Sequence, residues 1–167
     1  DDAKWIYDRA KELKAPLMAG SSLPVLWRYP PVDTRRDSNI EEVVAISYGS
    51  LDAYGFHALE MVQCLVERRA GGETGVRSVQ CLTGEAVWKA REAGRFSPKL
   101  FEATVDRLPV KRWINRDKTL EESVPEPVLW MVKYRDGLRV SVLTLNGAAT
   151  CWTAAWKYAG EDRIEST

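Results

Sequence analysis

The sequence predicts an α+β fold: an open, mostly antiparallel sheet of five or six strands with helices on one face. Two regions predict it. Residues 41–82 have the pattern of strand, helix, glycine-rich turn and strand, and residues 128–158 have the pattern of three strands separated by short turns. At 167 residues the chain has the size of a single domain with a substantial core.

The N-terminal segment has the pattern of a helix followed by a short strand. Three apolar residues recur at helical spacing: Ile6, Ala10 and Leu13. Pro16 ends this helix, and the apolar run 17–20 suits a buried strand. The chain has no initiator methionine and enters the helix at once. We therefore expect residues 1–22 to be the last helix and strand of an earlier α/β domain, and residues 23–167 to form the domain that follows it.

The central helix is predicted at residues 51–69, between strands at 43–48 and 76–82. Its apolar residues recur at helical spacing, so one face should be buried. They are Leu51, Tyr54, Ala58, Leu59, Val62, Leu65 and Val66. A strand–helix–strand unit of this length requires a crossover, which packs the helix on the sheet.

One flank of this helix carries the sharpest candidate site. It holds His57, the only histidine in the chain. Three further side chains share the flank: Glu60, Met61 and Cys64. A histidine beside a carboxylate can act as a general acid/base, with Glu60 fixing its tautomer. The alternative is a half-buried histidine that hydrogen bonds within the fold. A metal site is disfavoured because the sequence offers no second cluster of ligand residues.

The glycine-rich turn at 71–75 resembles a phosphate-binding loop only superficially. It follows a helix and precedes a strand, which reverses the order that points a helix N-terminus at phosphate. The sequence contains neither G-x-G-x-x-G nor a Walker motif. We therefore expect this chain alone to bind no nucleotide cofactor.

Further helices are predicted at residues 83–93 and 97–108, followed by a charged loop at 110–124. Three strands are then predicted at 128–134, 138–145 and 149–158, with a frayed end at 161–167. These helices suffice for one face of the sheet, so the other face of the final strands is predicted to be open. Its apolar side chains are Trp130, Trp152, Trp156 and Tyr158. Such a patch exceeds what a monomer usually exposes, which predicts a homo-oligomer formed through this sheet face. The alternative is that the loop at 110–127 folds over it.

Composition limits the partners. The 24 basic and 24 acidic residues leave no net charge, so neither nucleic acid nor an anionic membrane is an expected partner. No run approaches the roughly 18 apolar residues that span a bilayer. Three cysteines, Cys64, Cys81 and Cys151, lie in apolar segments without zinc-type spacing. They favour buried thiols in a reducing compartment over a disulfide, which predicts a cytoplasmic protein.

The run Gly55-Phe56-His57-Ala58-Leu59-Glu60, with its apolar helix and the strand at 76–81, resembles the glucose–fructose oxidoreductase / inositol dehydrogenase (Gfo/Idh/MocA) family. In that family the second domain opens with a strand and then a helix carrying G-x-H-x-x-D/E. The runs 16–24 and 67–76 look like a bacterial branch of the family. The likeness extends through Ala86-Val87-Trp88 into the terminal strands, so it covers nearly the whole chain.

This resemblance implies the second domain of a two-domain NAD(P)-dependent oxidoreductase, which shapes the substrate pocket and the subunit interface. The Rossmann half that binds NAD(P) would lie outside this chain except for residues 1–22, and the chain alone would be inactive. The implied substrate is a small polyol or sugar-like molecule. His57 would be catalytic, Glu60 would orient it, and Tyr54 and Met61 would contact the substrate.

The chain departs from the family pattern at one position. The catalytic aspartate of inositol dehydrogenase-like members falls on Ala53, and Asp52 lies one residue away, about 100° around a helix. This departure supports a second interpretation, a non-catalytic binding or assembly module that keeps the fold without the chemistry.

Overall fold

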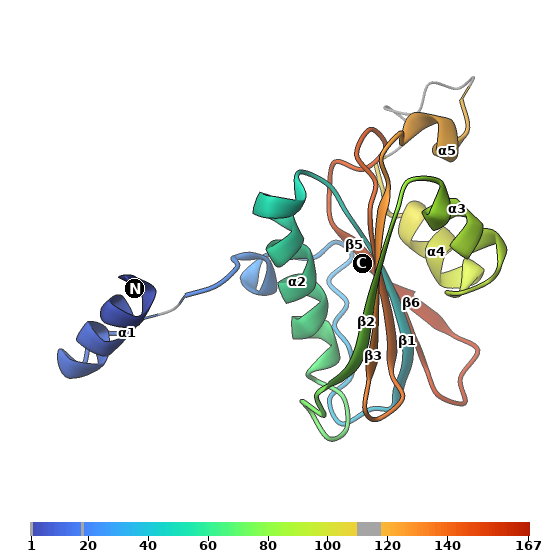
Figure 1. The fold of residues 1–167 in the computed structure, drawn as a ribbon. Coiled ribbons are helices and arrows are strands. Elements are labelled where there is room, and N and C mark those ends of the chain that lie inside the picture. The colour runs from blue at the N-terminus through green and yellow to red at the C-terminus, as the bar shows by residue number, and fades with distance from the viewer. Residues whose placement is uncertain (1, 18, 110–117) are drawn as a thin grey trace.

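A single six-stranded sheet forms the centre of the molecule, in the strand order β2-β3-β4-β1-β5-β6 (Figure 1). The computed structural model describes residues 2–17, 19–109 and 118–167. The strands are β1 (Ile40–Ser47), β2 (Val76–Thr83), β3 (Val128–Tyr134), β4 (Arg139–Thr144), β5 (Thr153–Tyr158) and β6 (Ile164–Ser166). Only β1 and β4 pair in parallel, and the other neighbours are antiparallel. This confirms the predicted α+β class and the open, mostly antiparallel sheet.

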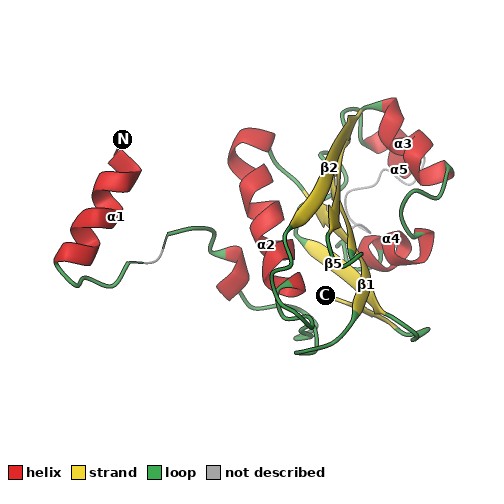
Figure 2. Ribbon diagram, turned by 60° about the horizontal axis from the view of Figure 1, so that its bottom comes forward, coloured by secondary structure: helices red, strands yellow, loops and turns green. Residues whose placement is uncertain are grey.

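Helices cover both faces of this sheet, so the prediction of helices on one face is wrong. They are α1 (Asp2–Glu12), α2 (Phe56–Val66), α3 (Glu85–Glu92), α4 (Pro98–Val105) and α5 (Leu120–Ser123), with helical turns η1 (Leu23–Val25) and η2 (Leu51–Gly55). α2 lies on one face, and α3 and α4 lie on the other (Figures 1 and 2). Two separate apolar cores result, one under α2 and one under α3 and α4.

The central strand β1 explains how two cores can share one sheet. Val43 and Ala45 point toward α2, whereas Val44 and Ile46 point toward α3 and α4. All four are completely buried. A strand covered on both faces has a continuous apolar run instead of an alternating pattern, as the sequence of β1 has.

The predicted crossover from β1 through α2 to β2 is present, but β1 and β2 are not neighbours in the sheet. The hairpin of β3 and β4 inserts between the two strands, and β2 therefore becomes an edge strand. Its side chains are almost all exposed. The turn between β3 and β4 falls at Arg135–Gly137 as predicted, where Gly137 takes a positive φ of 96°.

The sheet face predicted to be open is the face that α2 covers. Trp156 and Tyr158 are buried there against α2, and Trp130 and Trp152 are partly buried at its margin. These four residues therefore do not form the exposed oligomer surface that the sequence predicts. The alternative cover, the loop at 110–127, lies partly outside the described residues.

The C-terminal segment also differs from its prediction, because 161–167 is not frayed. β6 pairs with β5, and Thr167 exchanges two backbone hydrogen bonds of 2.9 Å with Ala154.

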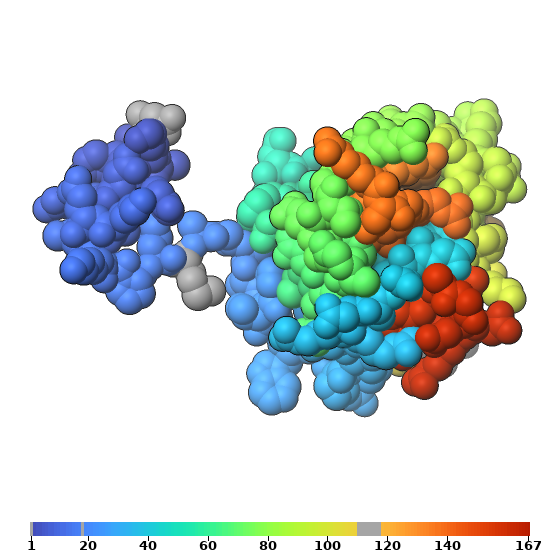
Figure 3. Space-filling model, turned by 90° about the horizontal axis from the view of Figure 1, so that it is seen from below, coloured from blue at the N-terminus to red at the C-terminus, as the bar shows by residue number. Residues whose placement is uncertain are grey.

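The N-terminal helix stands apart from the domain. α1 buries none of its side chains and lies well away from the sheet (Figure 3). The predicted strand at 17–20 is not formed at residues 17, 19 and 20, and Met18 lies outside the described residues. Beyond it, Thr34 anchors the extended segment to α2, since its Oγ1 donates a 2.6 Å hydrogen bond to the carbonyl of Leu65.

Among the described residues, no helix combines the length and apolar character that crossing a membrane requires.

Candidate functional site

His57 lies on the first turn of α2, just after β1 has ended at the middle of the sheet. The chain leaves β1 at Ser47 and turns through η2, which places His57 above the carboxyl end of that strand. Its Nδ1 lies 2.6 Å from Oγ of Ser21, in the segment that precedes η1. Ser21 is itself held in place, because its Oγ accepts a 3.1 Å hydrogen bond from the amide of Leu23. The imidazole is thus oriented from outside its own helix.

Aromatic rings form a wall beside the histidine. Tyr54 and Trp152 stack with centroids 5.8 Å apart and planes 13° from parallel, and Tyr48 packs against both at 5.4 and 5.2 Å. The His57 ring meets Trp152 edge-on at 6.5 Å. β5 runs antiparallel to β1, so the residue before β5 lies at the end of β1, and topology alone brings Trp152 to the histidine.

A slot runs from this cluster along α2. It is a cavity of about 220 Å³ between α2, the η1 segment and β5. Its apolar lining includes Leu23, Leu26, Met61, Leu65, Trp152 and Ala154. Met61 follows His57 by one helical turn, so both face the same side of α2. The predicted contact residue Met61 therefore does line a cavity, and Tyr54 lies in the aromatic wall.

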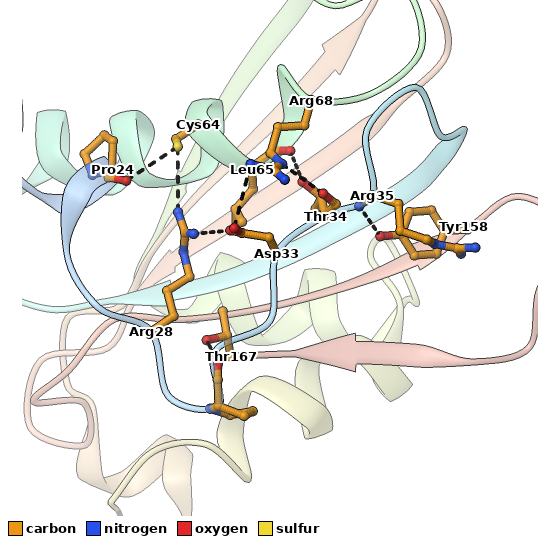
Figure 4. A network of polar contacts seen from close by, with 11 residues as sticks. Pro24, Arg28, Asp33, Thr34, Arg35, Cys64, Leu65, Arg68, Tyr158 and Thr167 are labelled. Carbon is orange, nitrogen blue, oxygen red and sulfur yellow. Dashed lines mark hydrogen bonds and ion pairs between the residues drawn. The ribbon is translucent and has the colours of Figure 1, made fainter.

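Arg28 lies at the far end of the slot. It lines the cavity, and its side chain is only 19% exposed. Its guanidinium pairs through Nη1 with the carboxylate of Asp33, and Nη2 lies 3.7 Å from Sγ of Cys64 (Figure 4). Arg68 approaches the other oxygen of Asp33 at 3.7 Å. Arg28 is thus the cation that lines the slot, whereas His57 is not part of the lining and lies against Trp152, which is.

The predicted role of Glu60 in orienting His57 has no support in the geometry. Glu60 is half-buried, its Oε2 lies toward the backbone of Gly20, and within the described residues no hydrogen bond joins it to His57. Ser21 takes that role instead. Sequence reasoning missed Ser21 and Arg28, because both belong to the proline-rich segment before β1, and no spacing rule ties that segment to α2.

Across residues 2–17, 19–109 and 118–167, no three His, Cys, Asp or Glu side chains gather closely enough to hold a metal ion. The three cysteines are free thiols; Cys81 is exposed and the other two are partly buried. Burial raises the pKa of the Cys151 thiol, which makes it less reactive than an ordinary cysteine.

The residues present do not fit the dinucleotide that the family resemblance implies. A dinucleotide site needs a glycine turn whose backbone the pyrophosphate can approach, between a strand and a helix. The corresponding turn here follows β1 at Gly49, and the Tyr54 ring fills the space above it, 2.5 Å from where a Cβ would stand. The turn is therefore closed by a side chain.

Comparisons with protein-family models, with curated proteins and with solved structures give no match to this chain.

Proposed function

We propose that this chain is the substrate-binding and oligomerisation domain of a Gfo/Idh/MocA-like NAD(P)-dependent oxidoreductase, inactive without a nucleotide-binding half. The observation that carries the proposal is the 2.6 Å contact between His57 and Ser21, beside a partly open slot that their neighbours Leu23, Met61 and Trp152 line. A ligand pocket typically combines an apolar lining with a few convergent polar groups, as this slot does.

His57 supplies the chemistry in this proposal. With Nδ1 engaged by Ser21, Nε2 is the nitrogen left to exchange a proton with a substrate hydroxyl. The Tyr54–Trp152 wall gives a small polyol or sugar-like ring an apolar surface to lie against. Because the turn after β1 does not fit a dinucleotide, no step is assigned to NAD(P) within this chain.

The helix α1 supports the two-domain part of the proposal. Its apolar side chains Trp5, Ile6 and Tyr7, and Leu13 just after it, are exposed and belong to neither apolar core. Apolar side chains on one short helix are stabilised when another surface covers them. An adjoining Rossmann-type domain, whose last helix this would be, provides such a surface.

A non-catalytic binding module is the second candidate, and two observations favour it. Ala53 stands where the family has a catalytic aspartate, and Glu60 does not reach His57. This candidate keeps the slot and its ligand but has no proton-transfer step.

Ligand-observed NMR with myo-inositol and glucose tests the proposal on the whole chain. We expect binding that His57→Gln and Ser21→Ala each weaken about tenfold, while Lys99→Gln, on the exposed start of α4, leaves it unchanged. Calorimetry with NADH should show no binding to this chain. Micromolar NADH affinity, or polyol binding unaffected by both site variants, would refute the proposal.

A further inference from the structure

We infer that the Arg28 end of the slot is a carboxylate subsite. The ligand would then be a hydroxylated monocarboxylate with an apolar middle, and a neutral polyol or sugar-like molecule would bind the same site only weakly. The inference rests on the proposed function, because it takes the slot below His57 as the ligand site. It narrows the substrate class of that site.

The first support is the charge at this end of the slot. Arg28 and Arg68 share a single carboxylate, that of Asp33, which leaves one positive charge in excess. Arg68 is further occupied by a 2.8 Å hydrogen bond from Nε to the carbonyl of Thr34. Arg28 is therefore the cation that faces the cavity.

The second support is the incomplete hydrogen bonding of Arg28. Its Nη1 is paired with Asp33, but the partner of Nη2 within the described residues is the Cys64 sulfur at 3.7 Å. A thiol is a weak acceptor, so a half-buried guanidinium keeps strong donors unsatisfied. A ligand carboxylate would accept a charge-assisted hydrogen bond from Nη2, which is much stronger than the contact with the thiol.

The third support is the lining of the slot, which is mainly apolar but includes Thr153 and Thr167. His57 lies outside this lining, eight residues before Leu65 on α2, which corresponds to about 12 Å along the helix axis. A ligand that fills the slot and extends past Trp152 to His57 needs an apolar body about this long, with a hydroxyl at His57 and an anion at Arg28. The single excess charge suits a carboxylate better than a doubly charged phosphate.

Matched probes test this inference on the whole chain. 3-(4-Hydroxyphenyl)propanoate has a hydroxyl, an apolar ring and a carboxylate, and its primary amide has the same shape without the charge. By calorimetry we expect the carboxylate to bind at least tenfold tighter than the amide. Arg28→Gln should remove that difference, Arg28→Lys should keep part of it, and Arg163→Gln, at an exposed arginine, should not change it.

The outcomes separate the inference from the proposed function. If both probes bind equally and Arg28→Gln changes neither, the carboxylate subsite is wrong while the slot stands. If His57→Gln leaves both affinities unchanged, the proposed role of His57 is wrong instead. If neither probe binds, the inference is wrong. If the corresponding phosphate ester binds more tightly than the carboxylate, Arg28 is a phosphate-binding residue instead. Should Arg28→Gln fail to fold, the carboxylate-to-amide ratio in the unaltered chain and its decrease with salt still decide the question.

Discussion

Arg69 carries a buried positive charge at the C-terminal end of α2, with 2% of its side chain exposed. Its guanidinium donates to the carboxylate of Asp136 at 2.7 Å, to the carbonyl of Val66 at 2.7 Å and to Oγ1 of Thr74 at 2.9 Å. It also lies over the ring of Tyr134, 4.7 Å from its centroid. Every side of this cation is thus occupied, and this makes its burial tolerable.

We expect Asp136→Asn to lower the free energy of unfolding by about 3 kcal/mol, because it leaves the Arg69 charge buried without a counter-ion. Urea denaturation at pH 7 measures this. The control is Glu161→Gln, which removes the exposed Arg35–Glu161 pair and should have a much smaller effect, because solvent screens that pair. Equal effects of the two changes would contradict the assignment.

The same carboxylate predicts a pH dependence. Burial raises the pKa of Asp136, but hydrogen bonds from Arg69 and from the Leu138 amide outweigh it and hold that pKa below its usual value. A lowered carboxyl pKa stabilises the fold above the unfolded value, about 3.9, and this contribution is lost as the pH falls through the folded value. The difference between the original chain and Asp136→Asn should therefore shrink below about pH 4.

Two tryptophans allow a direct test of which residues form the core. Trp156 is 0% exposed and donates a 3.0 Å hydrogen bond from Nε1 to the hydroxyl of Tyr158, whereas Trp27 is 99% exposed. We expect Trp156→Ala to cost about 4 kcal/mol of unfolding free energy, and Trp27→Ala to change it by less than about 0.5 kcal/mol. Chemical denaturation measures both. Comparable effects would mean that the α2-side core is assigned wrongly.

At the scale of elements, α2 presents a different face to the sheet from the one its periodicity predicts. Ala58, Val62, Leu65 and Val66 are buried as expected. Leu51, Tyr54 and Leu59 are exposed, and Met61 is buried in their place. The predicted stripe was drawn through residues of η2, whose wider π-type turn shifts their register relative to α2. That shift applies to Leu51 and Tyr54, whereas Met61 lies within α2, three residues after Ala58 and four before Leu65, and so shares their buried face.

The turn between β4 and β5 is fixed by contact with α5. Gly147 has a positive φ of 101°, and a Cβ there would stand 2.2 Å from the carbonyl oxygen of Ser123. Gly137, in the β3–β4 turn, has a similar φ but open space around it. We expect Gly137→Ala to cost about 1–2 kcal/mol for backbone strain alone, and Gly147→Ala to cost at least about 1 kcal/mol more. Thermal denaturation of the pair measures the difference, and equal costs would argue against the Ser123 contact.

At the scale of the whole molecule, self-association through Trp130, Trp152, Trp156 and Tyr158 is not possible as predicted, so another surface must form the contact. With Trp156 and Tyr158 covered by α2, the apolar groups left on that sheet face lie at the β2 edge: Val79, Cys81 and the exposed part of Trp130. Val79 is 62% exposed on an edge strand whose outer side has no neighbouring strand within the described part of the chain. Such an edge is prone to pair with another strand.

We therefore expect the chain to self-associate through this edge and Val79→Glu to disfavour association, because it places a charge in the contact. Light scattering across a dilution series measures the mass. Lys99→Glu, an equal charge change on the exposed start of α4, should leave the mass unchanged. A monomer at every concentration would disprove self-association, and an unaltered mass for Val79→Glu would exclude this edge.

The sequence by itself determined the class of the fold, strands β1 to β5, the central helix and the place of His57 on it. These features follow from periodicities and turn residues within a few positions of one another, such as the Ser97–Pro98 start of α4, where Ser97 Oγ does accept the Leu100 amide. Tertiary structure alone decided which face each helix covers and what surrounds the histidine. Ser21 and His57 are 36 residues apart, as are Arg28 and Cys64, and no local pattern links them. Their proximity arises because the segment before β1 folds back along α2, and that path depends on packing over the whole domain.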